Sequence, residues 1–215
     1  MKGWKKTLRI VLVWTMVLNI FAFASSPSMA AAAQQENLQL EAGSAILMEL
    51  ETGQILYEYN ADEALPPASM SKMMTEYLVL DAIKSGQISW DDVVTVGENA
   101  ASVIGSRIFL AEGDKHTVKE LYIAMAIASA NDASVALAEF IAGTEENFAQ
   151  RMNEKAREIG LSEQAHFINA TGLNRADMKE KFRPQSIQGE TLLSARDTAL
   201  LAANLLKDHP EALEF

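Results

Sequence analysis

The sequence predicts an α/β (α+β) fold in which an antiparallel sheet packs with a cluster of helices. Two apolar runs of strand length, residues 45–50 and 54–59, stand near the start of the chain. Apolar residues then recur at helical spacing in several later segments. With 215 residues, the chain is long enough to bury one substantial core.

Residues 1–30 have the pattern of a signal peptide. A basic start precedes an apolar run, residues 10–23, which is followed by Pro27 and the small residues of a cleavage site, Ser28-Met29-Ala30. The alternative is an uncleaved signal anchor, but a membrane-spanning helix needs about 20 apolar residues and this run is shorter. We therefore expect export with cleavage, followed by a flexible arm over residues 31–42.

The composition argues against several classes of partner. The chain has 18 Lys and Arg residues, 29 Asp and Glu residues and a net charge of −11. Four of the basic residues and none of the acidic ones lie in residues 1–30, so the remainder carries about −15 and repels phosphate backbones. The three histidines are widely spaced and cysteine is absent. We expect no nucleic-acid partner, no metal and no cofactor.

The two strand runs are predicted to form a hairpin. Ala45–Leu50 and Gln54–Tyr59 are joined by Glu51-Thr52-Gly53, where glycine supplies the positive φ of a tight turn. Because a lone hairpin is only marginally stable, we expect further strands of the same sheet beyond Phe215.

The helix after Pro66-Pro67 is predicted to be central, because its apolar residues recur at helical spacing until Lys84-Ser85-Gly86. Short extended pieces are expected at residues 93–96 and 108–110. A second helix should begin at Thr117. The expected core positions of the two helices are Met70, Met73, Met74, Tyr77, Leu80 and Ile83 in the first, and Val118, Leu121, Ile123, Ala124 and Ile127 in the second.

Three further helices complete the prediction. The first covers residues 133–141, with Asn131 or Asp132 as its N-cap and Gly143 at its end. The second covers residues 145–158, and the third, residues 194–207, is amphipathic with Ser194 as its N-cap. Between them we expect an extended segment at 166–168, a loop at 169–173 and a surface excursion at 174–190.

Ser69 and Lys72 form a Ser-x-x-Lys pattern at the start of the first helix. Residues three apart share a helix face, so the Lys72 amine can approach the Ser69 hydroxyl. Burial among methionines would favour the neutral amine that a general base requires. The structural alternative is that Ser69 caps the helix and Lys72 pairs with Glu76.

A second motif, Ser129-Ala130-Asn131, lies between two predicted helices. Its hydroxyl can relay a proton, and its amide can hold a substrate carbonyl. The alternative is an ordinary polar connection. The two motifs in this order weaken both structural alternatives.

These motifs and their surroundings resemble the serine D-Ala-D-Ala carboxypeptidases, the low-molecular-mass penicillin-binding proteins of peptidase family S11. The wider superfamily carries Ser-x-x-Lys, Ser-Asp-Asn and Lys-Thr-Gly motifs. The similarity covers nearly all of residues 43 to 213. It includes Glu51 to Tyr57, Pro67 to Lys72, Ser129 to Ala133, Ala138-Glu139, Met152-Asn153, His166-Phe167, Thr171 to Leu173 and Ser194 to Asp197.

The resemblance implies a penicillin-binding-protein/β-lactamase-like serine hydrolase with a catalytic domain over residues 43–215. It implies that Ser69 is the acylated nucleophile, Lys72 its proton acceptor, Ser129 a proton relay and Asn131 the substrate-amide contact. The Lys-Thr-Gly segment, which in the family forms the opposite wall of the site, does not occur in the chain. We therefore expect a catalytic domain truncated before its last strands.

The implied function is removal of the terminal D-alanine from the pentapeptide stems of peptidoglycan, with β-lactams acylating the same serine. Export implies an extracytoplasmic location, in the cell wall or at the outer face of the membrane, with membrane attachment only through segments absent from this chain. The alternatives are an inactive fragment that binds wall peptides without turnover, and a class A β-lactamase. The latter would need an acid in a Glu-x-x-Leu-Asn pattern, for which Glu158 to Ser162 is a poor match.

Few other side chains are candidates for function. We expect His116 and His209 to be solvated surface residues and His166 to be structural. Arg107 and Arg175 are candidates to contact an anionic substrate, but the sequence does not indicate where either side chain lies relative to the site.

Overall fold

The computed structural model describes residue 38 and residues 40–215. The predicted signal peptide and all but a few residues of the predicted arm lie outside the described residues, so both stay predictions. Residues 41–215 form one compact unit, which contains every element described below. Within the described part of the chain, no helix combines the length and apolar character needed to cross a membrane.

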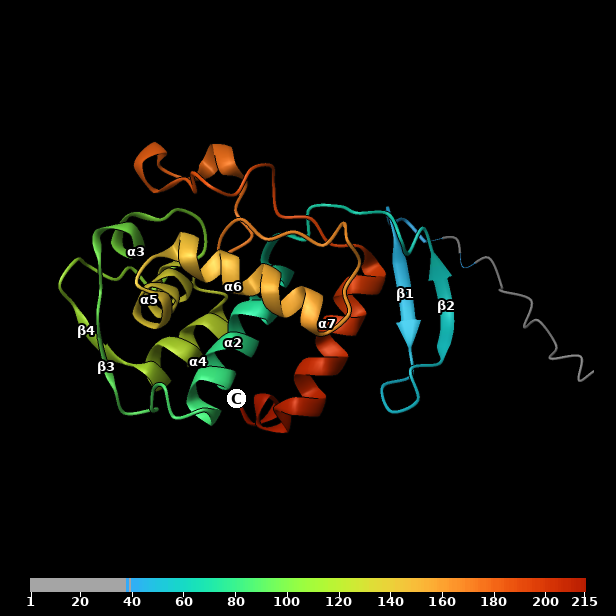
Figure 1. Ribbon diagram of the computed structural model, residues 1–215, viewed down its shortest axis with the longest axis horizontal. Helices are drawn as coiled ribbons and strands as arrows, with labels where there is room; N and C mark the ends of the chain where they lie inside the picture. The colour runs from blue at the N-terminus through green and yellow to red at the C-terminus, as the bar shows by residue number, and fades with distance from the viewer. Residues whose placement is uncertain (1–37, 39) are drawn as a thin grey trace, which may run out of the picture. The chain divides into compact units, whose positions relative to one another are not determined.

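The predicted hairpin is confirmed, with slightly shorter strands. β1 (Ala45–Met48) pairs antiparallel with β2 (Ile55–Tyr59), and Ala45 lies opposite Tyr59. The Glu49 carboxylate stabilises the turn by accepting the backbone N–H of Thr52 at 2.7 Å. One face of the hairpin lies toward helix α7 (Ala195–Asp208), whereas Leu47 and Leu56 on its other face are exposed (Figure 1).

Helices make up most of the remaining structure: four of them pack around α5 (Asn131–Ala142), whereas α7 packs on one of these four and on β1 (Figure 1). Nine of the twelve residues of α5 are buried, many of them small, so neighbouring helices approach it from several sides. The predicted first helix is also buried on more than one face, as expected. The helical bounds are η1 Ala68–Ser71, α2 Lys72–Lys84, α3 Glu98–Ser102, α4 Val118–Ala128, α5 Asn131–Ala142 and α6 Glu145–Glu158.

The starts of α4 and α7 follow the local capping signals, whereas α2 and α5 begin without a side-chain cap. Ser194 and Asp197 form a capping box at α7, and Thr117 and Glu120 form another at α4. The N-cap of α5 was wrongly predicted: it is Ala130, without a side-chain cap. Asp132 cannot serve there because its carboxylate accepts backbone N–H groups of the segment 108–110 instead.

The second sheet differs from the prediction. β3 (Val93–Thr95) was expected, but its partner is β4 (Lys115–Thr117), and residues 108–110 form no strand. The backbone of Phe109 has φ 63°, which is incompatible with an extended strand. His116 therefore lies in a strand, where it is partly exposed.

The core face of α4 was partly mispredicted. Val118 and Leu121 are buried as expected, but Ile123 and Ile127 are exposed, and Tyr122 and Met125 are buried in their place. The spacing of the buried set is i, i+3, i+4, i+7, which is one continuous helix face. Met70, another expected core residue, is exposed in the turn before α2.

The segment between α6 and α7 runs along the top of the view in Figure 1, where it forms the excursion before it reaches α7. His166 pairs with Leu192 in an isolated antiparallel bridge, and the excursion 174–190 contains two short turns, η2 (Arg175–Asp177) and η3 (Glu180–Phe182). The excursion is not wholly solvated, because Met178 and Ile187 bury their side chains in a small cluster with Ala149 and Ile168.

The prediction that His209 is solvated is wrong. After α7, the turn η4 (Pro210–Glu214) directs the chain back onto α2, and His209 has no exposed surface. Its Nε2 lies 2.8 Å from an oxygen of Asp81, and its ring packs edge-on against Tyr77. His209 therefore joins the end of α7 to α2.

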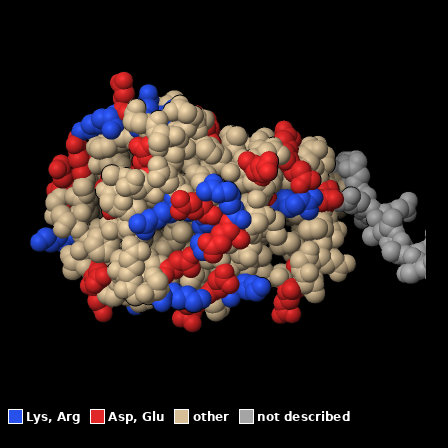
Figure 2. All heavy atoms as spheres, in the orientation of Figure 1, with Lys and Arg blue, Asp and Glu red and all other residues tan. Residues whose placement is uncertain are grey.

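The surface shows no segregation of charge on the face that Figure 2 displays. Lys and Arg side chains lie among Asp and Glu side chains there. Several of these charges pair, as Lys155 does with Asp81 and Glu158.

Candidate active site

Ser69 lies on a short turn that the sequence makes locally strained. Buried Pro67 precedes the turn η1, and Ala68 has φ 49°, a left-handed conformation that non-glycine residues rarely adopt. The result is a Ser69 side chain that is exposed at the start of helix α2 rather than buried in it. Strain of this kind is concentrated at functional sites.

Lys72 is the centre of the site. Its Nζ lies 3.0 Å from Ser69 Oγ, 3.3 Å from Ser129 Oγ and 3.1 Å from the carbonyl oxygen of Thr171. The expected approach of Lys72 to Ser69 is therefore present, and the alternative pairing with Glu76 is not, because Glu76 accepts the hydroxyl of Tyr122 at 2.6 Å.

Burial lowers the pKa of Lys72 from 10.5 to about 8. Only 5% of the residue is exposed, and removal from water disfavours the ammonium form. At neutral to mildly alkaline pH, a substantial fraction of the amine is therefore neutral, as a base for the Ser69 hydroxyl must be.

Ser129 reaches Lys72 because of an unusual backbone conformation. Only Ser129 and Ala130 separate α4 from α5, and Ser129 adopts φ 53° and ψ 35° to make that connection. A left-handed residue at a helix end is most often glycine. Here it is serine, and its hydroxyl lies within hydrogen-bonding distance of the amine.

The Thr171 carbonyl is a part of the site that the sequence does not reveal. It belongs to the Asn169–Leu173 loop, which we call the 169–173 loop. Buried Asn169 stabilises this loop, because its Oδ1 accepts the N–H groups of Thr171 at 3.0 Å and Gly172 at 2.8 Å. Gly172 lies so close to the Ser69 turn that a Cβ there would come within 2.0 Å of the Ala68 oxygen.

Glu145 supports the same loop from the start of α6. Its Oε1 accepts the backbone N–H of Ala170 at 3.1 Å, and its Oε2 accepts the side-chain N–H of Asn99 at 2.9 Å. Thr75 of α2 donates to the Ala170 oxygen at 2.8 Å. Burial raises the pKa of the Glu145 carboxyl above its ordinary value. Glu145 was not predicted from the sequence, since a lone Glu at a helix start signals only favourable dipole placement.

Asn131 is beside the cluster but is held differently from the expectation. Its Nδ2 donates to the carbonyl oxygen of Ile104 at 2.7 Å, whereas its buried Oδ1 has no hydrogen-bond partner within the described residues. The free group that Asn131 offers is thus an acceptor.

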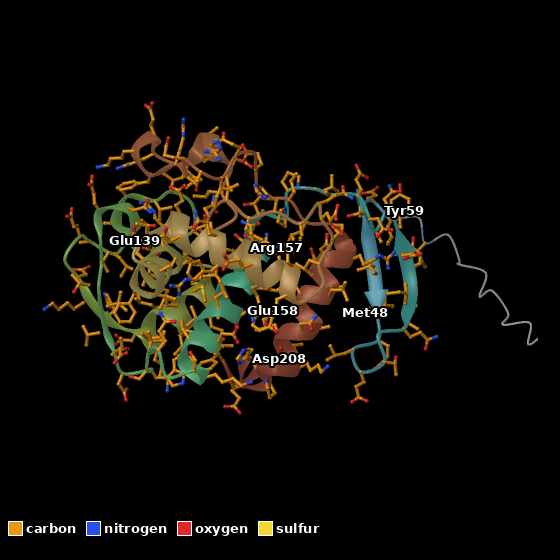
Figure 3. The ribbon with its side chains drawn as sticks, in the orientation of Figure 1. Met48, Tyr59, Glu139, Arg157, Glu158 and Asp208 are labelled. Carbon is orange, nitrogen blue, oxygen red and sulfur yellow. The ribbon has the colours of Figure 1, made fainter. Side chains whose placement is uncertain are left out.

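Arg175 and Glu158, two other residues considered from the sequence, are paired elsewhere in the protein. Arg175 is occupied by the backbone oxygens of Gly189, Pro184 and Ile187. Glu158, the acid that a β-lactamase would need, lies at the end of α6 and pairs with Lys155 at 2.9 Å (Figure 3). In the described part of the chain, no group of three or more His, Cys, Asp or Glu side chains is placed to hold a metal ion.

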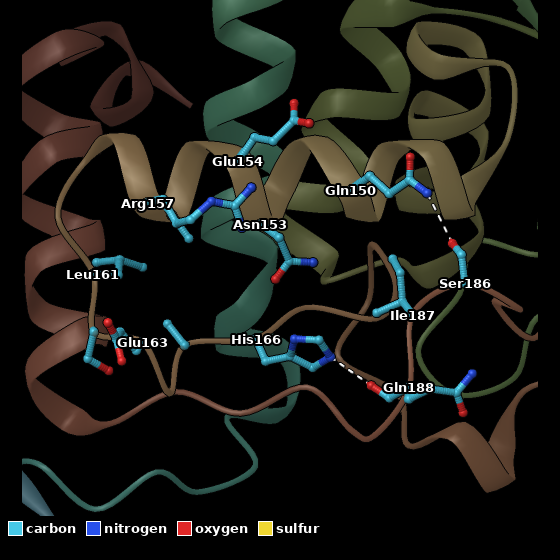
Figure 4. A pocket seen from close by; sticks show the side chains of 13 residues that line it. Gln150, Asn153, Glu154, Arg157, Leu161, Glu163, His166, Ser186, Ile187 and Gln188 are labelled. Carbon is cyan, nitrogen blue, oxygen red and sulfur yellow. Dashed lines mark hydrogen bonds between the residues drawn. The ribbon is translucent and has the colours of Figure 1, made fainter.

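A cavity of about 690 Å³ lies away from this cluster, between α6 and the segments 161–166 and 186–188 (Figure 4). Its polar groups are largely paired within the protein: Gln150 donates to Ser186 at 3.0 Å, and a ring nitrogen of His166 lies 2.8 Å from the oxygen of Gln188. None of the four predicted site residues lines it.

Comparison with known proteins gives the family. A family model described as D-alanyl-D-alanine carboxypeptidase, peptidase S11, matches residues 29–215. D-alanyl-D-alanine carboxypeptidase DacF of Bacillus subtilis is 43% identical over 201 residues, which are 91% of this chain and 48% of DacF. DacC of Escherichia coli is 38% identical over 198 residues, 89% of this chain and 46% of DacC. The chain thus spans about half the length of the curated relatives it matches.

Solved structures show the same relationship. The D-alanyl-D-alanine carboxypeptidase DacD of Francisella tularensis matches with a TM-score of 0.74 and 38% identity, over 83% of this chain and 40% of that protein. Penicillin-binding protein D2 of Listeria monocytogenes, in its ampicillin-bound form, matches with a TM-score of 0.71 and 34% identity, over 84% of this chain and 67% of that protein. With serine, lysine and second serine assembled within one fold of this kind, the chain belongs to the D-alanyl-D-alanine carboxypeptidase family, peptidase S11.

Proposed function

We propose that this protein acts as a serine D-Ala-D-Ala carboxypeptidase on peptidoglycan stem peptides, with Ser69 as nucleophile. The observation that carries the proposal is the buried Lys72 amine, which lies within hydrogen-bonding distance of both Ser69 Oγ and Ser129 Oγ. The family and the ampicillin-bound relative support the substrate class and reactivity with β-lactams.

Lys72 acts as the base of the first step. A neutral amine has two N–H groups and one lone pair. The Thr171 carbonyl oxygen can only accept, so it takes one N–H, and Ser129 Oγ takes the other. The lone pair is then directed at the Ser69 hydroxyl and removes its proton as Ser69 Oγ attacks the carbonyl carbon of the scissile bond.

The second step returns that proton. As the C–N bond breaks, the ammonium of Lys72 donates to Ser129 Oγ, whose own proton passes to the leaving D-alanine amine. Water then attacks the acyl-enzyme ester and gives a proton to Lys72, which passes it to Ser69 Oγ as the ester C–O bond breaks. Asn131 Oδ1 is a buried acceptor without a partner in the described part of the chain, which makes it the group of this residue that suits an N–H of the substrate.

We also propose that the protein is exported and acts outside the cytoplasm, in the cell wall or at the outer face of the membrane. The basic start and apolar run of residues 1–30 support this, as does the location of the substrate. Intact mass of the protein recovered from the expressing cells measures the cleavage site, which is expected near Ala30.

The test of catalysis is acylation and turnover in one preparation. Incubation with benzylpenicillin should add one ligand mass, and peptide mapping should place it on Ser69. D-Alanine should be released from diacetyl-Lys-D-Ala-D-Ala. Both signals should vanish in Ser69→Ala.

Ser71→Ala is the matched control on the same turn. The Ser71 hydroxyl is buried and without a partner in the described structure, so its removal should leave folding and acylation unchanged. An adduct that survives Ser69→Ala contradicts the nucleophile. A Ser69 adduct without D-alanine release identifies instead a protein that binds wall peptides without turnover.

A further inference from the structure

The loop formed by residues 103–111, which lies between α3 and β4, is fastened to the second catalytic motif. The Ser106 carbonyl oxygen accepts the backbone N–H of Asn131 at 2.7 Å, and the Ser106 hydroxyl donates to the Ala128 oxygen at 2.8 Å. The Ile104 carbonyl oxygen accepts the side-chain N–H of Asn131. The 103–111 loop thus lies against the residues on either side of Ser129.

This loop holds Phe109 exposed to solvent in a strained backbone conformation. It is 78% exposed and has φ 63°, a conformation that is a genuine outlier for a bulky residue. The buried Asp132 carboxylate maintains it by accepting the N–H groups of Ile108 at 3.1 Å and Leu110 at 3.0 Å, one on each side of Phe109. An exposed and strained aromatic residue that is fixed by a buried carboxylate indicates a functional constraint.

The Arg107 guanidinium packs on that aromatic ring in a cation–π contact. Its guanidinium carbon lies 5.1 Å from the centre of the Phe109 ring. Its Nε is buried without a hydrogen-bond partner, and among the described residues no carboxylate lies within ion-pair distance of it. The chain carries a net charge of −11, so an arginine without a carboxylate partner, on the loop that contacts Asn131, is a group that a ligand would complete.

The geometry suits a carboxylate. A guanidinium packed on an aromatic ring binds a planar, two-oxygen acceptor in the plane of its N–H groups, and because Arg107 Nε is buried, the two terminal NH2 groups are the ones that would take it. Because the loop that carries Arg107 is bound to Asn131, the expected contact to the substrate amide, we expect this cation on the acyl-donor side of a bound stem peptide.

We propose that Arg107, positioned by Phe109, determines specificity by binding a carboxylate of the stem peptide on the N-terminal side of the scissile D-Ala-D-Ala bond. The inference rests on the proposed function. It predicts a preference for stem peptides whose γ-linked D-glutamate retains its free α-carboxylate over those in which that group is amidated.

The experiment compares two peptides that differ only in this group, L-Ala-γ-D-Glu-L-Lys-D-Ala-D-Ala and its α-amide. Binding to the Ser69→Ala protein is measured by isothermal titration calorimetry, so that turnover does not interfere. The acid should bind about tenfold more tightly than the amide, as expected for a charge-assisted hydrogen-bonded pair, and the preference should fall with added salt.

Arg107→Met should abolish the preference while changing affinity for the amide by less than about twofold. Arg107→Lys should restore only part of it, since Lys cannot bind in the two-pronged manner. Phe109→Ala should reduce it through loss of orientation. Arg151→Met, at an exposed position on α6, is the matched control and should retain the full preference.

Equal affinity of the acid and amide peptides, no measurable binding of either, or a preference that survives Arg107→Met would each overturn the inference. Penicillin acylation of the unmutated protein distinguishes the two levels. Acylation at Ser69 with no acid preference overturns the role of Arg107 alone, whereas absence of both acylation and D-alanine release overturns the proposed function.

Discussion

The two loops that flank Lys72 and Asn131 use their polar groups in opposite ways. In the 169–173 loop, Asn169, Glu145 and Thr75 satisfy the backbone groups around Thr171. In the 103–111 loop and its contact with α5, Arg107 Nε and Asn131 Oδ1 are buried without partners in the described structure.

This difference separates two tasks. A general base must be oriented before the substrate arrives, so the groups around Lys72 are paired within the protein. A recognition surface must leave groups for the ligand, and two of the three buried unpaired side-chain atoms in the described structure, Arg107 Nε and Asn131 Oδ1, lie on the side of Asn131; the third, Ser71 Oγ, lies on the Ser69 turn. Substitutions on the two sides should therefore differ in size and in sign.

The largest effect is expected on the side of the 169–173 loop, at the general base Lys72. Lys72→Ala should slow acylation by benzylpenicillin by about 10²- to 10⁴-fold, because it removes a positioned proton acceptor. Stopped-flow or quenched mass spectrometry measures the rate. Lys119→Ala, an exposed position on α4, is the control and should react normally. A loss below tenfold in Lys72→Ala would mean that another group accepts the proton.

Gly172→Ala should break the packing of the 169–173 loop on the Ser69 turn. The new Cβ would meet the Ala68 oxygen at 2.0 Å and Ser71 Oγ at 2.5 Å, so the turn or the loop must move. We expect a loss of about 3 kcal/mol in the free energy of unfolding.

Gly160→Ala is the matched control for this change. Gly160 has φ 77°, but nothing lies within 4 Å of the added Cβ. It should therefore cost only about 1 kcal/mol from the left-handed conformation. Urea unfolding measures both variants, and equal losses would show that close packing at Gly172 does not matter.

Glu145→Ala should lower the free energy of unfolding by about 2 kcal/mol, since it leaves the N–H groups of Asn99 and Ala170 buried without an acceptor. Glu145→Gln keeps the volume and one acceptor and should lose less than half of that. A folded-state pKa raised above 4.5 means that wild-type stability falls as pH rises through the raised pKa. Denaturation of Glu145→Gln at several pH values should lack this slope.

The pH dependence of acylation should report Lys72. Because its pKa is lowered to about 8, the rate should rise about tenfold per pH unit below that value and level off above it. Benzylpenicillin acylation rates between about pH 6 and pH 9.5 measure the midpoint. A midpoint near 10.5, the ordinary lysine value, would contradict burial of the amine.

The smallest effect is expected in the 103–111 loop, where the substitution should raise stability rather than lower it. Phe109→Asn should raise the free energy of unfolding by about 0.5–1 kcal/mol, because Asn tolerates the left-handed conformation and removes exposed apolar surface. Thermal or urea unfolding measures it. A loss of stability instead would show that the Phe109 side chain stabilises the fold by packing against the protein.

Much of the site could be predicted from sequence because its parts are local. Ser69 and Lys72 are one helical turn apart, and the caps at Thr117 and Ser194 are written in adjacent residues. Gly143 ended α5 as expected, with φ 80°.

The predictions failed for groups whose surroundings are formed by segments distant along the chain. The Thr171 carbonyl has no side-chain signal, since every residue carries that group. His209 was predicted to be solvated from its neighbour Pro210, but η4 packs it against Tyr77 and Asp81. On α4, the apolar residues cover more than one face, so spacing alone did not identify which isoleucines, Ile123 and Ile127, stay exposed.

The wide separation of the catalytic groups along the chain has a consequence for the order of folding. Lys72 meets Ser129 across 57 residues and Thr171 across 99. Helices with their own caps can form locally, whereas closing such long loops carries an entropic cost that is met only when most of the core is in place. A refolding chain should therefore regain its helical content before its serine can react, which makes penicillin reactivity a sensor of the completed topology.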